Sequence, residues 1–593
     1  MKQLLTGDEA IARSAIDAGV CFASAYPGTP STEILQELAA QSDKIYAEWA
    51  PNEKVALESA IGAAIAGSRA MASMKHVGLN VAADPFFTNA YTGIGAGLVV
   101  ITADEPGMHS SQNEQDNRHY AYHANVPMFE PSNSQECYDM MQTAFELSET
   151  FDVPVLIRMT TRVCHSKSIV ELKEPKSKFN IPFKKNQEKY VTVPAIARQL
   201  RINLLQRNEK LKKYSIATAY NYAEMYDTAI GIVASGVCFD YAKEIFMENA
   251  SYYKVGFSHP MPLDNIKEFA SKVDKLYVLE ENDPIMETMI KSYGIQAIGK
   301  ELFPTEGEML PERIRLAFYG EELSGPKHSL EDVPPRPPTL CAGCPHRGLF
   351  YALGGRDGLF LSGDIGCYTL GYAPPFNAID TVTCMGASIS SAHGAQKIFD
   401  MFDSKMRAVA IIGDSTFLHT GLNSLMSVAY NNSKVVTIIL DNRITAMTGG
   451  QHNPGTGFNA SMGDAPIADL TAIAKALGIK HIKTVNPNML DEVEQALDWA
   501  VSLDEASVII TRWPCVLKKM TESDNTEFTG AYTEKYTVDE DACSSCAICL
   551  SAGCPAISVD NDTMLASIND SCVGCSICAQ ICPSEAIVLK EDN

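Results

Sequence analysis

The chain has 593 residues, too many for one hydrophobic core, so several domains are expected. Its 46% hydrophobic and 20% charged residues are typical of an ordinary soluble α/β protein. The net charge of −24 argues against a nucleic-acid partner, because a phosphate backbone attracts clustered Lys and Arg.

The N-terminal segment carries acidic residues and no continuous apolar core, so no signal peptide is predicted. The longest apolar run, near residues 93–103, is too short to cross a membrane. We therefore expect a cytoplasmic protein. Its 17 cysteines would then be reduced, and clusters among them are interpreted as metal sites rather than disulfides.

Residues 4–162 alternate helical and strand-like pieces with Gly and Pro at the joints, which predicts a first doubly wound domain. In the segment Tyr-Pro-Gly-Thr-Pro-Ser at 26–31, two prolines fix the backbone around Thr29. Such a rigid turn with a presented hydroxyl suits substrate binding, and an ordinary strand-to-helix connection is the alternative. Ser31, followed by Glu33, is a candidate cap for the next helix.

Two further segments of this domain carry candidate groups. A small-residue helix is predicted over 52–64, with Glu53 at its start, where an acidic residue is usually only a favourable dipole partner.

The polar segment 108–123 precedes Pro127, and long polar loops are often functional. Its Arg118 could clamp a substrate carboxylate. His119 and His123 could contact the keto group, or could simply lie on a solvated surface loop.

The middle of the chain holds no catalytic constellation. Residues 170–190 are Lys-rich and interrupted by Pro, which indicates a linker. A second α/β domain follows, with strands expected near 229–233 and 276–280. A Pro-rich connector at 325–338 then leads to a third domain.

The third domain opens with Cys341-Ala-Gly-Cys344, a spacing that indicates metal binding in a reduced compartment. Cys367 and Cys515 are the candidates to complete the ligand set, and Cys384 is the rival for either place. Spacing alone does not separate a zinc ion from an iron–sulfur cluster at these residues.

Residues 413–442 read as a βαβ unit with polar turns. An apolar run at 408–412 and a β-branched run at 435–440 flank a helical pattern at 421–431. Because parallel strands present their carboxyl ends at one edge, Asp414 and Asn442 could share a small hard cation, naturally magnesium with a diphosphate. A plain turn after the first strand is the alternative.

The C-terminal region contains two runs of the bacterial ferredoxin type, each ending in Cys-Pro, and the first run is one residue longer than usual. Two zinc ribbons are the alternative. The fourth cysteine of each run serves the other cluster. One [4Fe–4S] centre is therefore assigned to Cys543, Cys546, Cys549 and Cys582, and the second to Cys572, Cys575, Cys578 and Cys554.

These motifs together resemble the 2-oxoacid:ferredoxin oxidoreductases, across nearly the whole chain. The match is carried, in order, by YPGTPSTE, CAGCPHR, GDIGCYTLG, the Gly-Asp-Ser and Asp-Asn pair, TGGQHNPGTG and the double ferredoxin run. Ser415 and Asp441 depart from the usual thiamin-diphosphate signature, and neither removes a metal ligand.

The resemblance implies a multidomain α/β fold of doubly wound, thiamin-diphosphate-binding sheets, followed by an α+β domain of the bacterial 2[4Fe–4S] ferredoxin type. The expected domains are 1–170 for the pyrimidine, 190–325 in the middle, 335–525 for the diphosphate and magnesium, and 535–593 for the ferredoxin.

The resemblance also assigns roles to residues. Glu53 would bond N1′ of the aminopyrimidine, with Glu58 as a second choice. Thr29 and Arg118 would face the substrate. The cofactor would be bound by Glu53, Gly413, Asp414, Ser415, Asn442, Ile444, Thr448 and Gly449, with Mg²⁺ held by Asp414, Asn442 and the carbonyl of Ile444.

The implied reaction is the oxidative decarboxylation of aryl 2-oxoacids, such as indole-3-pyruvate, with coenzyme A. Electrons would pass through a proximal [4Fe–4S] cluster at Cys341, Cys344, Cys367 and Cys515 and through the tail clusters to an external ferredoxin. A small beta subunit and a dimer of alpha–beta units are also implied. Two alternatives stay open: a non-oxidative thiamin-diphosphate decarboxylase or carboligase, and an electron-transfer subunit without an active site.

Overall fold

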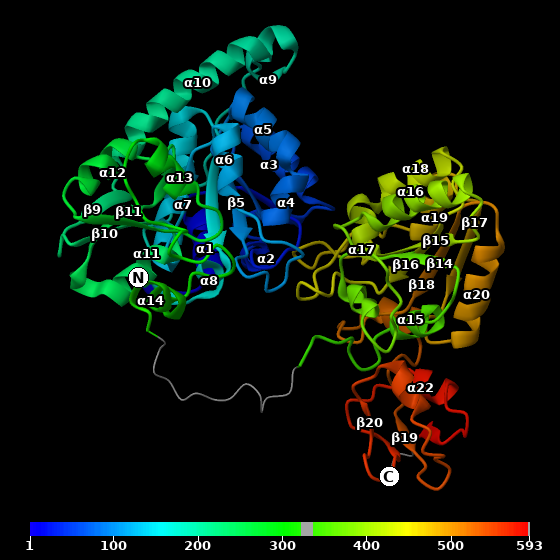
Figure 1. Ribbon diagram of the computed structural model, residues 1–593. Helices are drawn as coiled ribbons and strands as arrows, with labels where there is room; N and C mark the ends of the chain where they lie inside the picture. Colours follow the sequence, from blue (N-terminus) through cyan, green and yellow to red (C-terminus); the bar gives the residue numbers. More distant parts are fainter. Residues whose placement is uncertain (322–335, 591–593) are drawn as a thin grey trace. The chain divides into compact units, whose positions relative to one another are not determined.

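The computed structural model describes residues 1–321 and 336–590. Most of the expected connector at 325–338 lies outside the described residues. The chain divides into two compact units, Met1–Ser329 and Leu330–Asn593, and each is described by itself (Figure 1). Within the described ranges, no helix is both long and apolar enough to cross a bilayer.

The first unit is built on a seven-stranded sheet in the order β12-β6-β7-β5-β4-β2-β3. Its strands run parallel except for β12, which pairs antiparallel with β6. The strands are β2 (Phe22–Ala25), β3 (Tyr46–Trp49), β4 (Ala70–Lys75), β5 (Leu98–Asp104), β6 (Met128–Phe129), β7 (Val155–Thr160) and β12 (Phe257–His259). Most residues of β4, β5 and β7 are buried, as expected for parallel strands covered on both faces.

Local signals explain several helices of this sheet domain. Asn52 caps α3 by accepting from the N–H of Val55, and the helix ends at Gly67 in the left-handed region at φ 111°. The helix predicted over 52–64 is therefore confirmed. The helices are α1 (Gly7–Asp17), α2 (Thr32–Ala39), α3 (Glu53–Ala66), α4 (His76–Val81), α5 (Ala83–Thr92), α6 (Arg118–Ala124), α7 (Ser134–Phe151) and α8 (Thr161–His165). A short ribbon of β1 (Lys2–Leu5) and β8 (Ser168–Glu171) pairs antiparallel beside them.

The rest of the first unit forms a four-stranded sheet in the order β13-β10-β11-β9, with only β9 antiparallel. The strands expected near 229–233 and 276–280 are confirmed as β10 and β13. The elements are α9 (Gln187–Tyr190), α10 (Pro194–Ala217), β9 (Asn221–Glu224), β10 (Ile230–Ala234), α11 (Val237–Phe246), β11 (Ser251–Val255), α12 (Leu263–Ala270), β13 (Lys275–Leu279), α13 (Ile285–Ser292) and α14 (Pro311–Tyr319). Because β12 from this part joins the larger sheet, the predicted boundaries at 170 and 190 stay predictions.

The second unit contains a five-stranded parallel sheet in the order β14-β15-β16-β18-β17. Alternate residues of β15 pack on opposite faces: Val409 and Ile411 against α15 and α20, Ala410 and Ile412 against α16, α18 and α19 (Figure 1). The elements are α15 (Arg347–Leu353), β14 (Leu359–Ser362), α16 (Ser388–Met401), β15 (Arg407–Gly413), α17 (Asp414–Thr416), α18 (Leu422–Tyr430), β16 (Val436–Asp441), α19 (Leu470–Ala476), β17 (His481–Val485), α20 (Leu490–Ser502), β18 (Ser507–Arg512) and α21 (Glu522–Glu527). The predicted βαβ unit is confirmed, with a π-helical turn at Phe417–Gly421 before α18.

The C-terminal part of this unit is a small module of two antiparallel two-stranded sheets, β19-β22 and β20-β21. Its elements are β19 (Tyr536–Val538), β20 (Ile557–Val559), β21 (Ala566–Ile568), α22 (Ile577–Gln580) and β22 (Ile587–Leu589). Its small core includes cysteines of both runs and Leu490 from the start of α20, so the module packs directly on the five-stranded sheet domain.

Candidate functional site

The carboxyl edge of the second unit's sheet brings together the residues expected to hold a metal and a diphosphate. Gly413 at the end of β15 lies opposite Leu440 near the end of β16. Asp414 and Asn442 therefore emerge from neighbouring strands at one edge, as predicted, and both side chains are buried. The Oδ1 atom of Asn442 accepts from the N–H of Ile444 at 3.2 Å, which folds the chain after β16 back over this edge.

Asp414 is a buried carboxyl whose loss of hydration is offset by few hydrogen bonds. Its oxygens accept from the N–H of Ser415 at 2.8 Å and, at a long 3.4 Å, from Nδ2 of Asn453. Burial and the nearby charge of Asp441 raise the pKa of Asp414 to about 8. Asp441 itself is held by Arg512, with Oδ2 at 2.7 Å from Nε. A divalent cation beside Asp414 would supply the missing positive charge.

The segment that follows β16 forms a loop over the same edge. Thr445 and Gln451 form an isolated antiparallel bridge, and Gly449 between them has φ 114°. The hydroxyl of Thr445 donates to Oγ of Ser415 at 2.9 Å, and Thr448 bonds Gln451. Gly413 is required for packing, because a Cβ there would lie 2.6 Å from the ring of Tyr368. Ser415 thus lies beside Asp414 and contacts this loop through Thr445, while the roles of Thr448 and Gly449 in the same loop stay predictions.

Four cysteines from distant parts of the unit gather beside this edge. The electrostatic neighbours of Cys344 include Cys367 and Cys515, and those of Cys367 include Cys515 and Cys341. The N–H of Cys515 donates to the backbone carbonyl of Asn442 at 3.0 Å, so the group adjoins the predicted magnesium ligands. Burial raises the pKa of Cys344 to about 12, so its thiolate needs the positive charge of a metal or cluster.

Cys384, the rival ligand, is exposed and has Asp364 rather than a cysteine as its charged neighbour. The structure therefore favours Cys341, Cys344, Cys367 and Cys515 as one group. Whether they hold a cluster stays a prediction.

The ferredoxin-like module contains two cavities, and each is lined by four cysteines. One cavity is lined by Cys554, Cys572, Cys575 and Cys578. The other is lined by Cys543, Cys546, Cys549 and Cys582. Each set combines three cysteines of one run with the fourth of the other, which is the exchange expected from the sequence.

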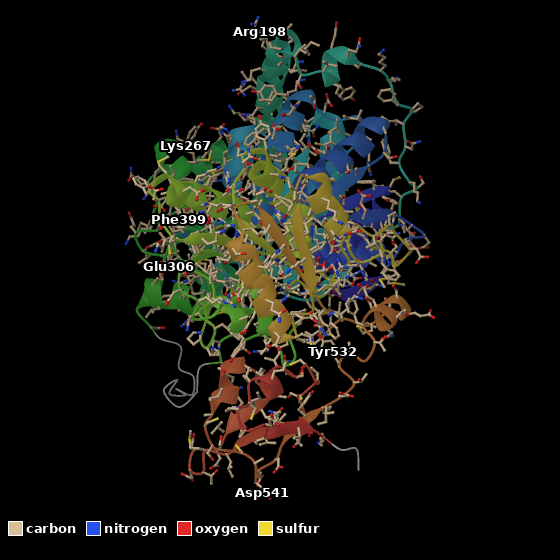
Figure 2. The ribbon with its side chains drawn as sticks, turned by 90° about the vertical axis from the view of Figure 1, so that its right-hand side faces the viewer. Arg198, Lys267, Glu306, Phe399, Tyr532 and Asp541 are labelled. Atoms are coloured by element: carbon tan, nitrogen blue, oxygen red, sulfur yellow. The ribbon has the colours of Figure 1, made fainter. Side chains whose placement is uncertain are left out.

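The first of these cavities reaches the segment that carries Cys341 and Cys344. Gly343 and Arg347 line it, and a Cβ on Gly343 would lie 2.0 Å from Val573. The buried guanidinium of Arg347 donates to the carbonyl of Cys341 at 2.9 Å and to that of Ala552 at 3.1 Å. Tyr532, which has Cys344, Cys515 and Cys575 as charged neighbours, lies at the same junction (Figure 2). The two cysteine-bearing regions are therefore held together.

In the first unit, Glu53 is buried at the first turn of α3, 5% exposed. Gly78 of α4 approaches it so closely that a Cβ there would lie 2.7 Å from Oε1 of Glu53. Glu58 lies on the surface of the same helix, 45% exposed, in an ion pair with Lys54. Geometry therefore favours Glu53 over the second choice, Glu58, for any role that needs a buried carboxyl.

The turn that follows β2 presents Thr29. Thr29 is partly exposed between buried neighbours, and Gly28 packs on Lys75, whose Cγ would lie 3.1 Å from a Cβ. Ser31 occupies the cap position of α2, but its hydroxyl donates to the carbonyl of Gly28 at 3.1 Å rather than capping the helix. The predicted Ser31 cap is therefore wrong, because the tight turn offers the hydroxyl a closer acceptor.

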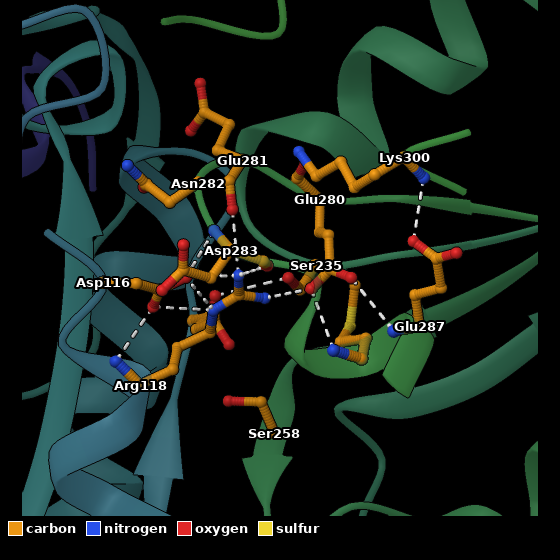
Figure 3. Close-up of polar contacts among 12 residues, drawn as sticks. Asp116, Arg118, Ser235, Ser258, Glu280, Glu281, Asn282, Asp283, Glu287 and Lys300 are labelled. Carbon is orange, nitrogen blue, oxygen red and sulfur yellow. Dashed lines mark hydrogen bonds and ion pairs between the residues drawn. The ribbon is translucent and has the colours of Figure 1, made fainter. Parts of the chain in front are cut away.

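Arg118 does not present a free guanidinium. The side chain is 1% exposed, and Figure 3 shows it among acidic and backbone oxygens. Its Nη1 lies 2.6 Å from Oε2 of Glu280, its Nε donates to Asp116 at 2.9 Å, and its Nη2 donates to the carbonyls of Glu281 and Asp283. Burial opposes ionisation of Asp116, but the charges of Arg118 and Arg158 outweigh it and lower the pKa of Asp116 to about 2. A substrate clamp at Arg118 would require these bonds to be exchanged.

We expect the replacement Arg118→Met to destabilise the first unit by about 3–5 kcal/mol, because it leaves the buried Glu280 without its cationic partner and Asp116 with only Arg158, 3.8 Å away. Denaturant unfolding followed by circular dichroism measures the effect. The control is Arg315→Met, which breaks an exposed pair with Glu321 and should cost about 1 kcal/mol or less. Unchanged stability with weakened 2-oxoacid binding would instead favour the clamp.

The two histidines of the polar segment lie at the surface, as in the alternative reading. His119 pairs with Asp283 at 2.9 Å, and both side chains are more than half exposed. The ring of His123 is exposed and packs edge-on against Phe87, with ring centroids 4.8 Å apart. The expected loop also ends earlier than predicted, because α6 begins at Arg118.

Comparison with known proteins agrees with this arrangement. Residues 13–228 match the family described as pyruvate flavodoxin/ferredoxin oxidoreductase, thiamine-diphosphate-binding. Residues 364–511 match the C-terminal thiamine-pyrophosphate-binding domain of thiamine pyrophosphate enzymes, and residues 567–588 match a 4Fe-4S binding domain.

Three relatives that match this chain over nearly their whole length carry the same name. The chain is 40% identical to the indolepyruvate oxidoreductase subunit IorA of Methanothermobacter marburgensis, over 98% of this chain and 96% of that protein. It is 39% identical to the same subunit of Pyrococcus abyssi, with the same shares covered, and 38% identical to that of Archaeoglobus fulgidus over 100% and 98%. The chain belongs to the IorA family. The fold is accordingly that of thiamin-diphosphate-binding domains with a 4Fe–4S ferredoxin domain.

The residues at the sheet edge fit the cofactor that the IorA family implies. A carboxylate, an amide oxygen and a backbone carbonyl are the hard oxygen donors that Mg²⁺ prefers. The raised pKa of Asp414 marks a charge that the protein alone does not neutralise. Gly449 and Gly450, at φ 114° and 88°, carry no side chain that would hinder close backbone approach, whereas the space beside Gly413 is filled by Tyr368.

Two residues of this IorA-family site were not assigned from the sequence. His346 is buried, its pKa is lowered to about 4 by burial, and its Nε2 lies 3.5 Å from Nδ2 of Asn442. Asp364 accepts from the N–H groups of Ile365, Gly386 and Ser388 at 2.7–2.9 Å and so fixes the turn after β14. Both residues belong to motifs that support the resemblance, CAGCPHR and GDIGCY. In each motif only the cysteines were assigned a function from the sequence.

Proposed function

We propose that this chain is the large subunit of an enzyme that oxidatively decarboxylates aryl 2-oxoacids with coenzyme A and reduces ferredoxin. One observation carries the proposal. The chain is related over nearly its full length to indolepyruvate oxidoreductase subunits. In it, the N–H of Cys515 donates a hydrogen bond to the carbonyl of Asn442, so a candidate cluster ligand adjoins the predicted diphosphate edge. When bound, thiamin diphosphate supplies a nucleophilic carbon that attacks the keto group and keeps the bonding electrons when CO2 leaves.

The second unit provides the metal and diphosphate ligands. Asp414, the side-chain oxygen of Asn442 and the carbonyl of Ile444 would hold Mg²⁺. Ser415, together with Thr448 and Gly449 of the loop after β16, would orient the diphosphate, while Gly413 lets the backbone pass Tyr368. Burial of this edge strengthens each of these charge interactions.

The first unit would provide the acid–base group that exchanges a proton with the cofactor. Glu53 would hand a proton to N1′ of the aminopyrimidine and take it back. Its burial beneath Gly78 excludes water from the carboxyl. Thr29, partly exposed on its rigid turn, would donate a hydrogen bond to the 2-oxoacid. Arg118, by contrast, would stabilise the buried acids around it rather than bind substrate, unless its ion pairs open.

The cysteine groups provide an electron exit. Cys341, Cys344, Cys367 and Cys515 would hold the first cluster, beside the diphosphate edge. The set at Cys554, Cys572, Cys575 and Cys578 follows, because Gly343 and Arg347 line its cavity. The set at Cys543, Cys546, Cys549 and Cys582 would pass electrons to an external ferredoxin. Low potentials of [4Fe–4S] clusters suit this route.

The proposed assembly includes a partner. The relatives are named as subunits, so we propose a small beta subunit and a dimer of alpha–beta units. Coenzyme A would accept the acyl group.

The change Cys515→Ser should remove the proximal cluster alone, lowering bound iron from about twelve to about eight atoms per chain. Iron and sulfide assays on anaerobically purified protein measure this, and the spectra of the tail clusters should persist. The matched control is Cys384→Ser, an exposed cysteine whose loss should leave iron unchanged. Loss of iron in the Cys384 variant, but not in the Cys515 variant, would reverse the assignment.

The proposed function is tested with the chain coexpressed with its partner subunit. Indole-3-pyruvate with coenzyme A should reduce ferredoxin and release CO2 under anaerobic conditions. CO2 release without ferredoxin reduction would instead identify a non-oxidative decarboxylase, the alternative. Faster ferredoxin reduction with pyruvate than with indole-3-pyruvate would overturn the aryl substrate.

A further inference from the structure

A further cluster of metal-ligating side chains lies in the first unit, apart from the residues assigned above to the cofactor and clusters. It consists of Asp8, Glu33 and His165. One ligand atom from each residue lies within 4.8 Å of those of the other two, and Nε2 of His165 lies 3.9 Å from Oε2 of Glu33. An ion bound about 2.1 Å from each donor holds its ligand atoms roughly 3–4 Å apart. Small side-chain movements would close the cluster around one cation.

Three helices bring these side chains together. Asp8 is in the first turn of α1, Glu33 in the first turn of α2, and His165 ends α8. α1 packs against both other helices. Gly7 allows the close approach to α8, because a Cβ there would lie 2.1 Å from the carbonyl oxygen of Val163. The convergence is therefore built by packing rather than by chance contacts of mobile surface chains.

The burial of Asp8 without a hydrogen-bond partner points to a bound ligand. The side chain is 1% exposed, and neither carboxyl oxygen has a hydrogen-bond partner of normal geometry among the described residues. The thiol of Cys164, a weak donor, is near it. Burying a carboxyl without a partner is costly, and such groups are normally paired or bound to metal. The neighbouring acid in the capping box, Glu9, is by contrast satisfied by the N–H of Thr6 at 2.7 Å.

We infer that Asp8, Glu33 and His165 bind one divalent transition-metal cation of the zinc class. An imidazole with two carboxylates suits such ions better than Mg²⁺ or Ca²⁺, which prefer all-oxygen sets. Glu33 and His165 are 48% and 42% exposed, so the ion would enter from solvent and keep water in its remaining positions. Because His165 also contacts the backbone of Pro30, the ion would tie α1 and α8 to the turn that carries Thr29.

The test uses the full chain, purified anaerobically with its clusters and saturated with Mg²⁺ and thiamin diphosphate. Equilibrium dialysis against zinc chloride, read by mass spectrometry of the metal, counts zinc per chain. The wild-type protein should bind one more zinc than Asp8→Asn and His165→Ala, or bind it at least about tenfold more tightly. Glu37→Gln is the matched control, an exposed acid of α2 outside the cluster, and it should behave as wild type.

Iron content and circular dichroism check that each variant is folded. His165→Ala changes a partly exposed side chain, so it keeps the test decisive if Asp8→Asn does not fold. Equal zinc binding by the wild-type and His165→Ala proteins would overturn the proposal and leave Asp8 as a buried acid beside Cys164. Because zinc content is the readout, this result does not depend on the proposed decarboxylation.

Discussion

Replacing Asp414 by Asn should lower indole-3-pyruvate-dependent ferredoxin reduction at least about 100-fold, because the variant lacks the only ionised ligand proposed for Mg²⁺. Thiamin diphosphate content should fall in parallel. Iron content should not change, since neither the proximal cysteines nor the ferredoxin cavities use this carboxyl. Steady-state turnover, cofactor analysis and iron assays on one preparation measure all three quantities.

The stability of the Asp414 variant separates metal loss from misfolding. In the cofactor-free protein, burial and Asp441 raise the pKa of Asp414 to about 8, so the ionised carboxyl opposes folding. For an acid with a raised pKa, the destabilisation grows as pH rises above the unfolded value and is complete above about 8. A neutral Asn should therefore raise thermal stability of the cofactor-free protein at pH 8.

Asp498→Asn is the control for the Asp414 variant. Asp498 is an exposed acid on α20, 71% accessible and paired with Arg356, and its loss should affect neither activity nor cofactor content. Wild-type activity in the Asp414 variant would remove the metal assignment altogether.

The second large effect is expected at Glu53. The change Glu53→Gln keeps the shape of the side chain but removes the proton that Glu53 is proposed to exchange with N1′, so the turnover rate should fall about 10²–10⁴-fold. Thiamin diphosphate should stay bound, because the proposed metal and diphosphate contacts remain and the Gln amide can still donate a hydrogen bond to N1′. Iron should stay bound because Glu53 is not part of the cysteine groups. Turnover measured beside cofactor content shows whether binding and chemistry separate in this way.

Glu58→Gln provides the matched comparison on the same helix. Glu58 is exposed and paired with Lys54, so its change should leave the rate within about twofold of wild type, since exposed ion pairs contribute little. A large loss in the Glu58 variant with a normal Glu53 variant would exchange the two roles and point to a different register of the α3 helix over the pyrimidine.

Features set by short-range spacing were predictable from the sequence. The continuous apolar runs of β15 and β16 and the helical pattern of α18 predicted the βαβ unit, because parallel strands buried on both faces have uninterrupted apolar sequences. The two cysteine runs predicted which four residues surround each cavity, because each run supplies three closely spaced cysteines to one cavity and its fourth cysteine to the other. The proximity of Asp414 and Asn442 was predictable for a similar reason, because neighbouring parallel strands end at the same edge of a sheet.

Only the tertiary structure decided which partners polar side chains take. Arg118 had the chemistry of a carboxylate clamp, and long-range packing placed it instead against Glu280, 162 residues away. Ser31 had a capping pattern, and the preceding turn captured its hydroxyl.

The same reason applies to the groups that no local pattern marks. Cys344, Cys367 and Cys515 come from three separate segments, as do Asp8, Glu33 and His165. The sequence by itself determined the family, the sheet edge and the ferredoxin cysteines, because these depend on local spacing. The tertiary structure determined which buried charges are paired, and it left Asp8 without a hydrogen-bond partner of normal geometry among the described residues, because pairing depends on contacts between distant helices.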